Sequence, residues 1–415
     1  MAPYEIQVLD KEDFCQQYIV PLQSESQLRA LAPSAVRVRT ETLSLTVNNT
    51  TYAKLGSHFG WWDVHPLPAA IPKGFSNPQK YGQISAWGFA RVIESNYPQL
   101  PVNSVVYGYL PIGTLPVDLQ LSPSKDEKQV LEVSPHRSHV LPIYNRYLIF
   151  SASEIASSSR YSQGWSSLIR PLFQTSWMLN TFLFAGDESL LVKPSHQASS
   201  WTIQDADITS AIVILLSASG KTALTLAHQL RRARHPSLQP QKVVGVTSKR
   251  SLAFTKTTEL HDEVVHYEAA TPELLGDLSI SSCSKVVLCD FGSRGNSFQT
   301  WVELLKPACK SLILLGIGDT PQVESQESLQ NKFIQGASLG KIQVNASDLS
   351  DMAMTLIGED RYRQRLEESW REFLETGALP GVSLEWGSGM RSVEKVWNML
   401  CSDEIDSRKG YVIEL

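Results

Sequence analysis

The feature that most constrains the fold is a regular alternation of apolar strands and amphipathic helices from residue 211 onward. The run at 211–216 is apolar throughout, and similar short runs recur with room for a helix between them. Strands without polar alternation belong in a parallel sheet covered on both faces. The alternation therefore predicts a doubly wound, nucleotide-binding type of sheet. The expected strands are 211–216, 242–247, 263–267, 285–290 and 311–315, and the expected helices are 222–232, 251–260 and 298–305.

The first 150 residues have a different pattern, in which short β-type runs are separated by glycine and proline. Residues 35–41 alternate between apolar and polar at period two, which is typical of a half-buried strand. Many short strands of this kind predict a small β-barrel or sandwich. The stretch 116–138 mixes proline, serine and charges, and is expected to be an exposed loop. The serine-rich stretch 151–167 is expected to be a linker or an ordered loop, followed by a helix at 168–184.

The C-terminal part predicts that the first domain is discontinuous. Helices are expected at 360–375 and 392–400, and the chain ends on a strand at 410–415. A terminal strand needs a partner, and the N-terminal β region offers one. The expected division is a first domain of residues 1–165 completed by 345–415, and a second, Rossmann-type domain of residues 166–344.

Composition and charge exclude several classes of protein. The 37 basic and 42 acidic side chains give a net charge of −5, which argues against a protein that wraps nucleic acid. Hydrophobic residues make up 42% of the chain, too many for a disordered one. No apolar run approaches the roughly 20 residues of a membrane span. The N-terminus lacks a signal-peptide pattern, and the five scattered cysteines suit a reducing compartment, so a cytoplasmic protein is expected.

Small residues cluster where the first parallel strand turns into a helix, at Ser217-Ala218-Ser219-Gly220-Lys221-Thr222. Such a turn lets backbone N–H groups and a helix N-terminus meet a phosphate. Gly220-Lys221-Thr222 matches the end of an NTPase phosphate loop, but Leu215 stands where that motif requires its first glycine. Three readings stay open: a dinucleotide-binding turn with serines in place of glycines, an NTPase loop, and a tight turn that binds no nucleotide.

The end of the second strand favours the dinucleotide reading. In such folds this edge faces the adenosine ribose, where an acidic residue would accept hydrogen bonds from the 2′-hydroxyl of NAD. Here the sequence is Ser248-Lys249-Arg250, and a hydroxyl followed by two cations suits the 2′-phosphate of NADP. We therefore expect NADP(H) as cofactor. The alternative is a solvated start of a helix.

The whole layout resembles the medium-chain dehydrogenase/reductase superfamily, especially its zinc-free quinone-oxidoreductase and enoyl-reductase branches. Several stretches carry the resemblance. They are Asn48-Asn49-Thr50-Thr51-Tyr52 at the first active-site loop, the strand at 86–94, Val105-Val106-Tyr107-Gly108, the stretch at 304–316 that is similar to "LLKPGGRLVLLG", and the close at 409–415.

The resemblance implies the fold class, the cofactor and the site. The fold is α/β, with a GroES-like β-barrel catalytic domain and a Rossmann-type domain with a doubly wound parallel sheet. Cysteine and histidine ligands of the zinc-containing members are missing, so no metal is expected. A homodimer is implied. The candidate catalytic residues are Tyr52, Asn49, Thr51 and Tyr81. The candidate cofactor-binding residues are Ser217, Ser219, Gly220, Lys221, Thr222, Ser248, Lys249, Arg250, Tyr267, Phe291, Gly316 and Thr175.

Two functional hypotheses follow from the resemblance. The first is a metal-independent NADP(H)-dependent oxidoreductase that reduces a small enone, quinone or enoyl carbonyl substrate, with a role in secondary metabolism as one setting. The second keeps the fold but has a non-redox catalytic role or a cofactor-binding regulatory role. The altered glycine turn and the lack of an obvious acid motivate the second, because an ordinary phenol with a pKa of about 10 is a slow proton donor.

Overall fold

The computed structural model describes all residues except 1–2, 23–28, 199, 319–330 and 332–333. The described chain divides into two compact units. The first comprises Met1–Leu168 and Ser383–Leu415, and the second comprises the described residues of Ile169–Thr320 and Glu324–Val382. Within the described residues, no helix combines the length and the apolar character that crossing a membrane requires.

A closed six-stranded barrel forms the centre of the first unit. The strands follow one another in the order β3-β5-β6-β9-β8-β7, and β7 pairs back with β3. Closure leaves no free edge in this part of the sheet. The barrel interior is filled by apolar side chains such as Val36, Val92, Leu119 and Val130. The strands are β3 (Ala35–Leu45), β5 (Ser85–Ser95), β6 (Val105–Pro111), β7 (Val117–Pro123), β8 (Gln129–Glu132) and β9 (Arg146–Phe150).

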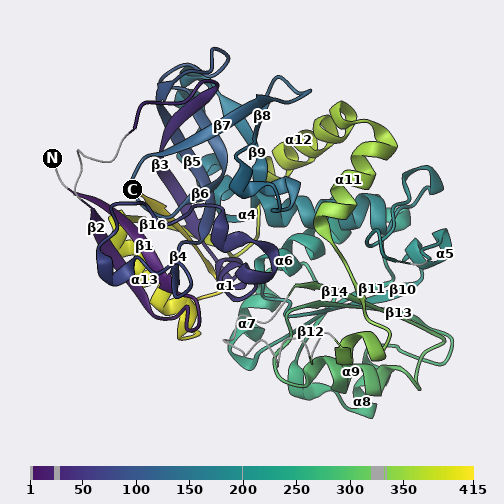
Figure 1. Cartoon of the computed structure of the whole chain (residues 1–415). Coiled ribbons are helices and arrows are strands. Elements are labelled where there is room, and N and C mark those ends of the chain that lie inside the picture. The colour runs from purple at the N-terminus through teal and green to yellow at the C-terminus, as the bar shows by residue number, and fades with distance from the viewer. Residues whose placement is uncertain (1–2, 23–28, 199, 319–330, 332–333) are drawn as a thin grey trace. The chain divides into compact units, whose positions relative to one another are not determined.

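The C-terminal segment returns to this barrel, as the sequence predicted. Strand β17 (Lys409–Glu414) pairs antiparallel with β3, and β16 (Ser383–Ser388) pairs parallel with β17. Helix α13 (Gly389–Cys401) joins the two strands and packs on a small sheet of three strands near the N-terminus (Figure 1). That sheet has the order β2-β1-β4, with β1 (Tyr4–Asp10), β2 (Gln17–Leu22) and β4 (Tyr81–Gly82).

Short helices connect the strands of the first unit. Helix α1 (Val47–Lys54) begins with a capping box, in which Thr46 and Asn49 each satisfy a backbone N–H of the other. The chain that resembles a first active-site loop is therefore helical here. The other short helices are α2 (Gly56–Phe59), η1 (Trp61–Asp63), η2 (Lys73–Phe75), η3 (Pro135–Arg137), η4 (Pro142–Asn145) and α3 (Ala152–Ser157).

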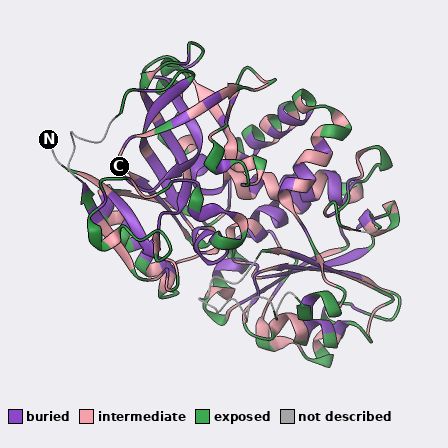
Figure 2. Ribbon diagram, in the orientation of Figure 1, coloured by how far each residue is buried: buried purple, intermediate pink, exposed green. Residues whose placement is uncertain are grey.

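The second unit contains a six-stranded parallel sheet in the order β12-β11-β10-β13-β14-β15. Strands β10 and β13 lie at its centre and are almost wholly buried, which explains why the sequence shows them as unbroken apolar runs (Figure 2). The strands are β10 (Ala211–Leu216), β11 (Lys242–Thr247), β12 (Glu263–His266), β13 (Lys285–Phe291), β14 (Ser311–Gly318) and β15 (Ile342–Gln343). The order confirms the doubly wound sheet that the sequence predicted.

Helices connect the strands of this sheet. They are α6 (Lys221–His228) with its continuation η7 (Gln229–Ala233), η8 (Pro236–Leu238), α7 (Lys249–Thr257), η9 (Tyr267–Ala269), α8 (Pro272–Asp277) and α9 (Ser297–Leu305). The short helices η6 (Glu188–Leu190) and α5 (Ile203–Ala206) precede the sheet, and α11 (Ala346–Ile357) follows it.

Helices α11 and α12 (Glu359–Glu375) group with the second unit, whereas the sequence analysis placed residues 345–382 with the first. The physical reason is an aromatic contact with helix α4 (Arg160–Met178) and its continuation η5 (Leu179–Leu183). Phe173 of α4 packs against Trp370 and Phe373 of α12, at centroid distances of 5.1 and 4.8 Å. The charged appearance of α12 comes from its outer face and hides this apolar one.

Two stretches expected to lack regular structure are ordered. Residues 116–138 supply β7 and β8, the strands that close the barrel, so the expectation of an exposed loop was wrong. Most of the serine-rich stretch 151–167 is helical, because Ser151 caps α3 and α4 begins at Arg160. Serine and proline suggested loops, but here Ser151 caps α3 through the N–H of Glu154, and Pro123 stands at the end of β7.

Candidate functional site

The turn after β10 in the second unit has the form of an anion-binding loop. Ser217 adopts a left-handed backbone conformation with φ of +62°, and the N–H of Gly220 donates to the carbonyl of Ser217 at 2.8 Å. Gly220 is the N-cap residue of α6, and within the described residues no side chain caps this helix. In the described part of the chain, no side-chain cap therefore competes there with an anion, which the helix dipole favours.

Ser217 ties the ends of three strands together. Its hydroxyl lies 2.8 Å from the hydroxyl of Tyr267, which follows β12, and donates to the carbonyl of Gly292, beyond β13, at 2.8 Å. Burial raises the pKa of Tyr267 above its usual value, so this phenol keeps its proton. The structure thus brings together two of the predicted cofactor residues at the carboxyl ends of the parallel strands, where such sheets bind ligands.

A second edge of this loop is formed by the end of β11. The hydroxyl of Thr247 donates to the hydroxyl of Ser219 at 3.0 Å, which links the two strand ends. Ser248 caps α7 by accepting from the N–H of Ser251 at 3.3 Å, so its hydroxyl has a structural role. Lys249 and Arg250 open the helix and are exposed. Lys249 lies near the Glu268 carboxylate and helps lower its pKa.

The predicted residues Phe291 and Gly316 lie at the ends of β13 and β14 beside a buried ion pair. Lys341 donates to the buried Asp290 carboxylate at 2.6 Å, and the other oxygen of Asp290 accepts from the N–H groups of Gly292 and Ser293. A Cβ atom at Gly316 would lie 2.6 Å from the Lys341 side chain, so the glycine lets that side chain approach the strand. This pair holds the loop after β13 in place.

Thr175 and its neighbour have different environments on α4. The Thr175 hydroxyl donates to the carbonyl of Pro171 at 3.1 Å, a bond within its own helix. The buried Ser176 instead donates to the carbonyl of Thr222 at 3.0 Å and lies 2.7 Å from the hydroxyl of Thr225. Ser176, which the sequence analysis did not single out, links α4 to α6 through these contacts.

In the first unit, Tyr52 lies within a dense aromatic cluster. Its ring makes edge contacts with Trp61, Tyr109 and Tyr144 at centroid distances of 4.8, 5.0 and 5.8 Å. The Tyr52 oxygen accepts N–H bonds from Asn48 at 2.6 Å and from Trp87 at 3.0 Å. Burial is the main cause that raises the pKa of Tyr52 to about 12, so the phenol is protonated at neutral pH.

The same cluster contains polar atoms that have no hydrogen-bond partner of ordinary geometry among the described residues. They are the indole nitrogen of Trp61, the hydroxyl of Tyr109 and the hydroxyl of Ser85, all of them buried. Leaving a buried polar group unsatisfied costs about 1–3 kcal/mol. Weaker contacts of Trp61 with the Tyr144 hydroxyl and of the Ser85 backbone with the Tyr109 hydroxyl partly satisfy two of these atoms.

The remaining predicted catalytic residues have other environments. Asn49 is buried, and its amide bonds to the backbone of Thr46 at 2.8 Å and Ser85 at 3.2 Å, so it holds α1 in place. Thr51 is half-buried on the same helix. Tyr81 packs in a different aromatic group, with Tyr18 and Phe75 on the small sheet at 6.1 and 5.3 Å. The structure does not bring Tyr81 into contact with the Tyr52 ring.

Sequence reasoning missed the residues that surround the Tyr52 oxygen. Asn48 stands one residue from a predicted site residue, and the i to i+4 spacing on a helix was the available signal. Trp87 lies in the stretch 86–94 that carries part of the resemblance, but its side chain was not predicted as a site residue. Tyr144 comes from the short helix η4, and no motif in the sequence marks it. Among the described residues, no group of three or more His, Cys, Asp or Glu side chains could hold a metal ion.

Solved structures with the same architecture match the whole chain. CurA from Vibrio vulnificus in complex with NADPH is 13% identical, with 99% of this chain and 98% of that chain covered and a TM-score of 0.54. Etr1p from Candida tropicalis, in a complex with NADP and crotonyl-CoA, is 13% identical over all of both chains, with a TM-score of 0.53. A Bacillus thuringiensis protein assigned as an NADPH:quinone reductase is 12% identical over all of both chains, with a TM-score of 0.54.

These likenesses confirm the predicted fold. At 12–13% identity they show the fold alone and not the activity. The chain has the architecture of the medium-chain dehydrogenase/reductase superfamily, with a GroES-like barrel and a Rossmann-type sheet. Residues 43–406 match the family model described as "Protein of unknown function (DUF2855)", and the chain belongs to that family. No curated protein matches the sequence.

Proposed function

We propose that the protein is an NADPH-dependent reductase that acts on a conjugated carbonyl, such as an enone, a quinone or an enoyl thioester. The observation that supports this proposal most is the arrangement at the ends of β10 and β11. There an uncapped helix N-terminus adjoins a serine-rich turn, and the exposed Lys249 and Arg250 follow directly on the next strand. Neighbours of the same fold are described with NADPH or NADP bound, which supports the cofactor.

The donors at this edge fit the two phosphate groups of the cofactor. The pyrophosphate would meet the N–H groups at the start of α6, as in other sheets of this topology. The 2′-phosphate would meet Lys249 and Arg250, since a guanidinium binds phosphate in a bidentate manner. No acidic residue stands at 247–250 to bind a free 2′-hydroxyl. The residues present therefore favour NADPH over NADH.

The aromatic cluster supplies the groups for the substrate. When bound, the cofactor would supply a hydride, and the protein must then stabilise the negative charge that develops on the carbonyl oxygen. The Tyr52 hydroxyl, held by Asn48 and Trp87, is the proposed hydrogen-bond donor to that oxygen. The proposed reductase needs no metal and acts in the cytoplasm as a homodimer. Analytical ultracentrifugation would test the homodimer.

A binding experiment tests the cofactor. NADPH, NADH and ATP are titrated while the melting temperature and the affinity are measured. We expect NADPH to bind at least about tenfold more tightly than NADH, because a charged phosphate contact contributes about 1.5–3 kcal/mol. The double variant K249A/R250A should lose that preference, whereas K256A, on the exposed last turn of the same helix, should retain it. Binding of ATP without NADPH would overturn the proposal.

A turnover experiment tests the redox step separately. NADPH oxidation is followed with a panel of enones, quinones and enoyl thioesters. Oxidation that depends on one of these substrates would support the reductase. Tight binding of NADPH without oxidation on the whole panel would instead support the alternative, a non-redox or regulatory role on the same fold. The second outcome has a physical motive, because the pKa of Tyr52 makes it a weak proton donor at neutral pH.

A further inference from the structure

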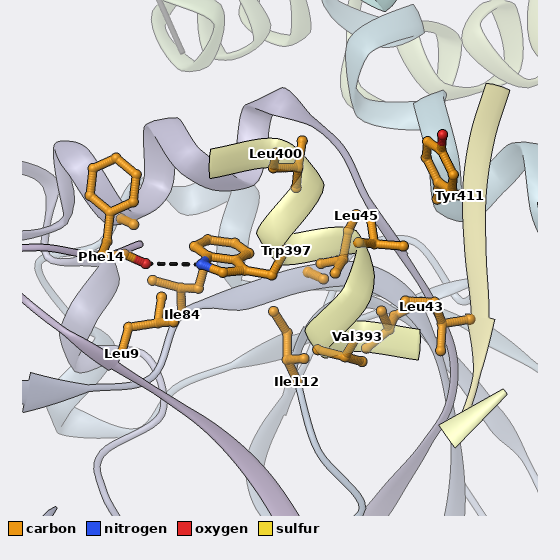
Figure 3. Close-up of a cluster of buried hydrophobic side chains, with 14 of the residues drawn as sticks. Leu9, Phe14, Leu43, Leu45, Ile84, Ile112, Val393, Trp397, Leu400 and Tyr411 are labelled. Carbon is orange, nitrogen blue, oxygen red and sulfur yellow. Dashed lines mark hydrogen bonds between the residues drawn. The ribbon is translucent and has the colours of Figure 1, made fainter. Parts of the chain in front are cut away.

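Two cysteines that are far apart in the sequence meet in the first unit. Cys15 lies in the turn between β1 and β2, and Cys401 is the last residue of α13. Both are partly buried against the same apolar cluster, which includes Phe14, Trp397 and Leu400 (Figure 3). The two thiols therefore approach each other from opposite ends of the chain.

Hydrogen bonds on either side of Cys15 fix this approach. The indole nitrogen of Trp397 donates to the carbonyl of Phe14 at 2.9 Å (Figure 3). The amide of Gln17 donates to Asn398 and to the carbonyl of Glu394, at 2.7 and 2.8 Å. Cys401 follows Trp397 by four residues, so it lies on the same face of α13, one turn further along. The β1–β2 turn is thus held against the side of the helix that carries Cys401.

The thiols of Cys15 and Cys401 interact with each other, and this interaction lowers the pKa of Cys15 and raises the pKa of Cys401. Burial and the neighbouring Asp13 carboxylate raise the pKa of both thiols. The lowered pKa favours Cys15 as the nucleophilic member of the pair, because the thiolate is the reactive form.

We propose that Cys15 and Cys401 form a reversible intramolecular disulfide when the protein meets a peroxide. The Cys15 thiolate attacks one peroxide oxygen, the O–O bond breaks, and a sulfenic acid and an alcohol or water are formed. The sulfur of Cys401 then attacks the sulfenic sulfur, the S–S bond forms, and water leaves. In total, two thiols and one peroxide give one disulfide, one alcohol or water, and one water.

The disulfide would link the β1–β2 turn covalently to α13. Helix α13 contacts β1, β2, β17 and also α1, the helix that carries Asn48 and Tyr52. The other three cysteines do not offer such a pair. Cys283 is exposed, Cys289 is buried with a pKa raised by that burial, and Cys309 donates to the carbonyl of Leu305, the last residue of α9.

The test is a titration of the full-length protein with hydrogen peroxide, followed by peptide mapping without reductant. We expect the loss of two of the five thiols, a cross-linked peptide pair containing Cys15 and Cys401, and complete reversal by dithiothreitol. Because the bond closes a loop of nearly the whole chain, the melting temperature should rise, on the order of 5 °C. C15S and C401S should each abolish the cross-link and the rise, and C283S should retain both.

Three results would overturn the proposal. One is a cross-link that survives in C15S or C401S, and another is a cross-link that is lost in C283S. The third is overoxidation of Cys15 to sulfinic acid without any bond to Cys401. The reduced variants are compared with the reduced parent by circular dichroism, so that a failure to fold is distinguished from a failure to cross-link. The readouts involve neither NADPH nor a carbonyl substrate, so they are independent of the proposed reductase activity.

Discussion

The Tyr52 hydroxyl is the group on which the proposed chemistry depends most. In Y52F the ring keeps its edge contacts with Trp61 and Tyr109, but the N–H groups of Asn48 and Trp87 lose their acceptor. We expect a loss of about 1–3 kcal/mol in unfolding free energy. We also expect turnover of a carbonyl substrate to fall by a factor on the order of 10², with NADPH affinity unchanged. Steady-state kinetics and isothermal titration measure the two effects.

Tyr109 provides the matched control for this variant. Its buried hydroxyl has no hydrogen-bond partner of ordinary geometry among the described residues, and its ring lies 5.0 Å from that of Tyr52. Y109F therefore removes a hydroxyl from the same cluster while the bonds of Asn48 and Trp87 to Tyr52 remain, and it should cost less stability than Y52F. Equal turnover of Y52F and the parent would rule out Tyr52 as the donor.

Ser217 offers a second test, which concerns the backbone conformation of the turn after β10. S217A removes the contacts to Tyr267 and Gly292 while the left-handed backbone remains, and we expect about 1–2 kcal/mol of destabilisation. S217G removes the same contacts but adopts φ of +62° without steric cost, so it should be less destabilising than S217A. Urea unfolding of the two variants measures the difference, and the reverse order would contradict the role assigned to the backbone.

The neighbours of the turn after β10 could be predicted from the sequence better than the residues around Tyr52. The carboxyl ends of parallel strands converge, so Ser217, Ser219 and Tyr267 could be placed together once the strands were recognised. Around Tyr52, the partners Trp87 and Tyr144 come from a distant strand and a short helix, and their approach depends on how the barrel closes. A pattern in the sequence shows which residue types are present, but not which of them meet across a closed sheet.

At the scale of elements, we expect barrel closure to depend on Arg37 of β3. Its buried guanidinium pairs with Asp118 of β7 at 2.7 Å and with Glu94 of β5, so one side chain joins three strands. We expect R37M to lower the unfolding free energy by about 2–3 kcal/mol. This is less than the 3–5 kcal/mol of a fully buried pair, because both carboxylates are nearly half exposed and can be hydrated.

Arg91 gives the comparison for R37M. It pairs with Glu41 of β3 at 2.6 Å, but both side chains are about 30% exposed and the pair joins strands that already share a long ladder. R91M should therefore cost no more than about 1 kcal/mol. Urea unfolding at low and high salt measures both variants. A loss for R37M no greater than that for R91M would show that the Arg37 pairs do not hold β7 in place.

The closing strands also show the limit of prediction at this scale. Residues 116–138 contain proline, serine and charges, which favour loops in isolation. Strand β7 nevertheless forms because it has partners on both sides, β3 and β8, and its apolar residues Val117, Leu119 and Leu121 face the barrel core. The apolar strands of the parallel sheet needed no such context, and the sequence located them to within a few residues.

At the scale of the whole molecule, buried histidines predict acid sensitivity in both units. Burial lowers the pKa of His228 and of His261 to about 4, and lowers the pKa of His65 well below its usual value. Cations oppose protonation as well, since Arg232 lies near His228 and Arg231 near His261. In the unfolded chain these imidazoles titrate near pH 6.5, so between about pH 6.5 and 4 the unfolded state binds protons that the folded state excludes.

Stability should therefore be fully present above about pH 6.5 and should fall as the pH drops toward 4. Each histidine contributes a slope of about 1.4 kcal/mol per pH unit within this window, and the contributions of His228 and His261 level off below about pH 4. H261L should make the slope shallower by one such contribution, because leucine fills the buried site without titrating. H196Q, at an exposed position, should leave the slope unchanged. Denaturant unfolding at pH 7.5, 6.0 and 5.0 measures the slopes, and parallel profiles for H261L and the parent would refute the assignment.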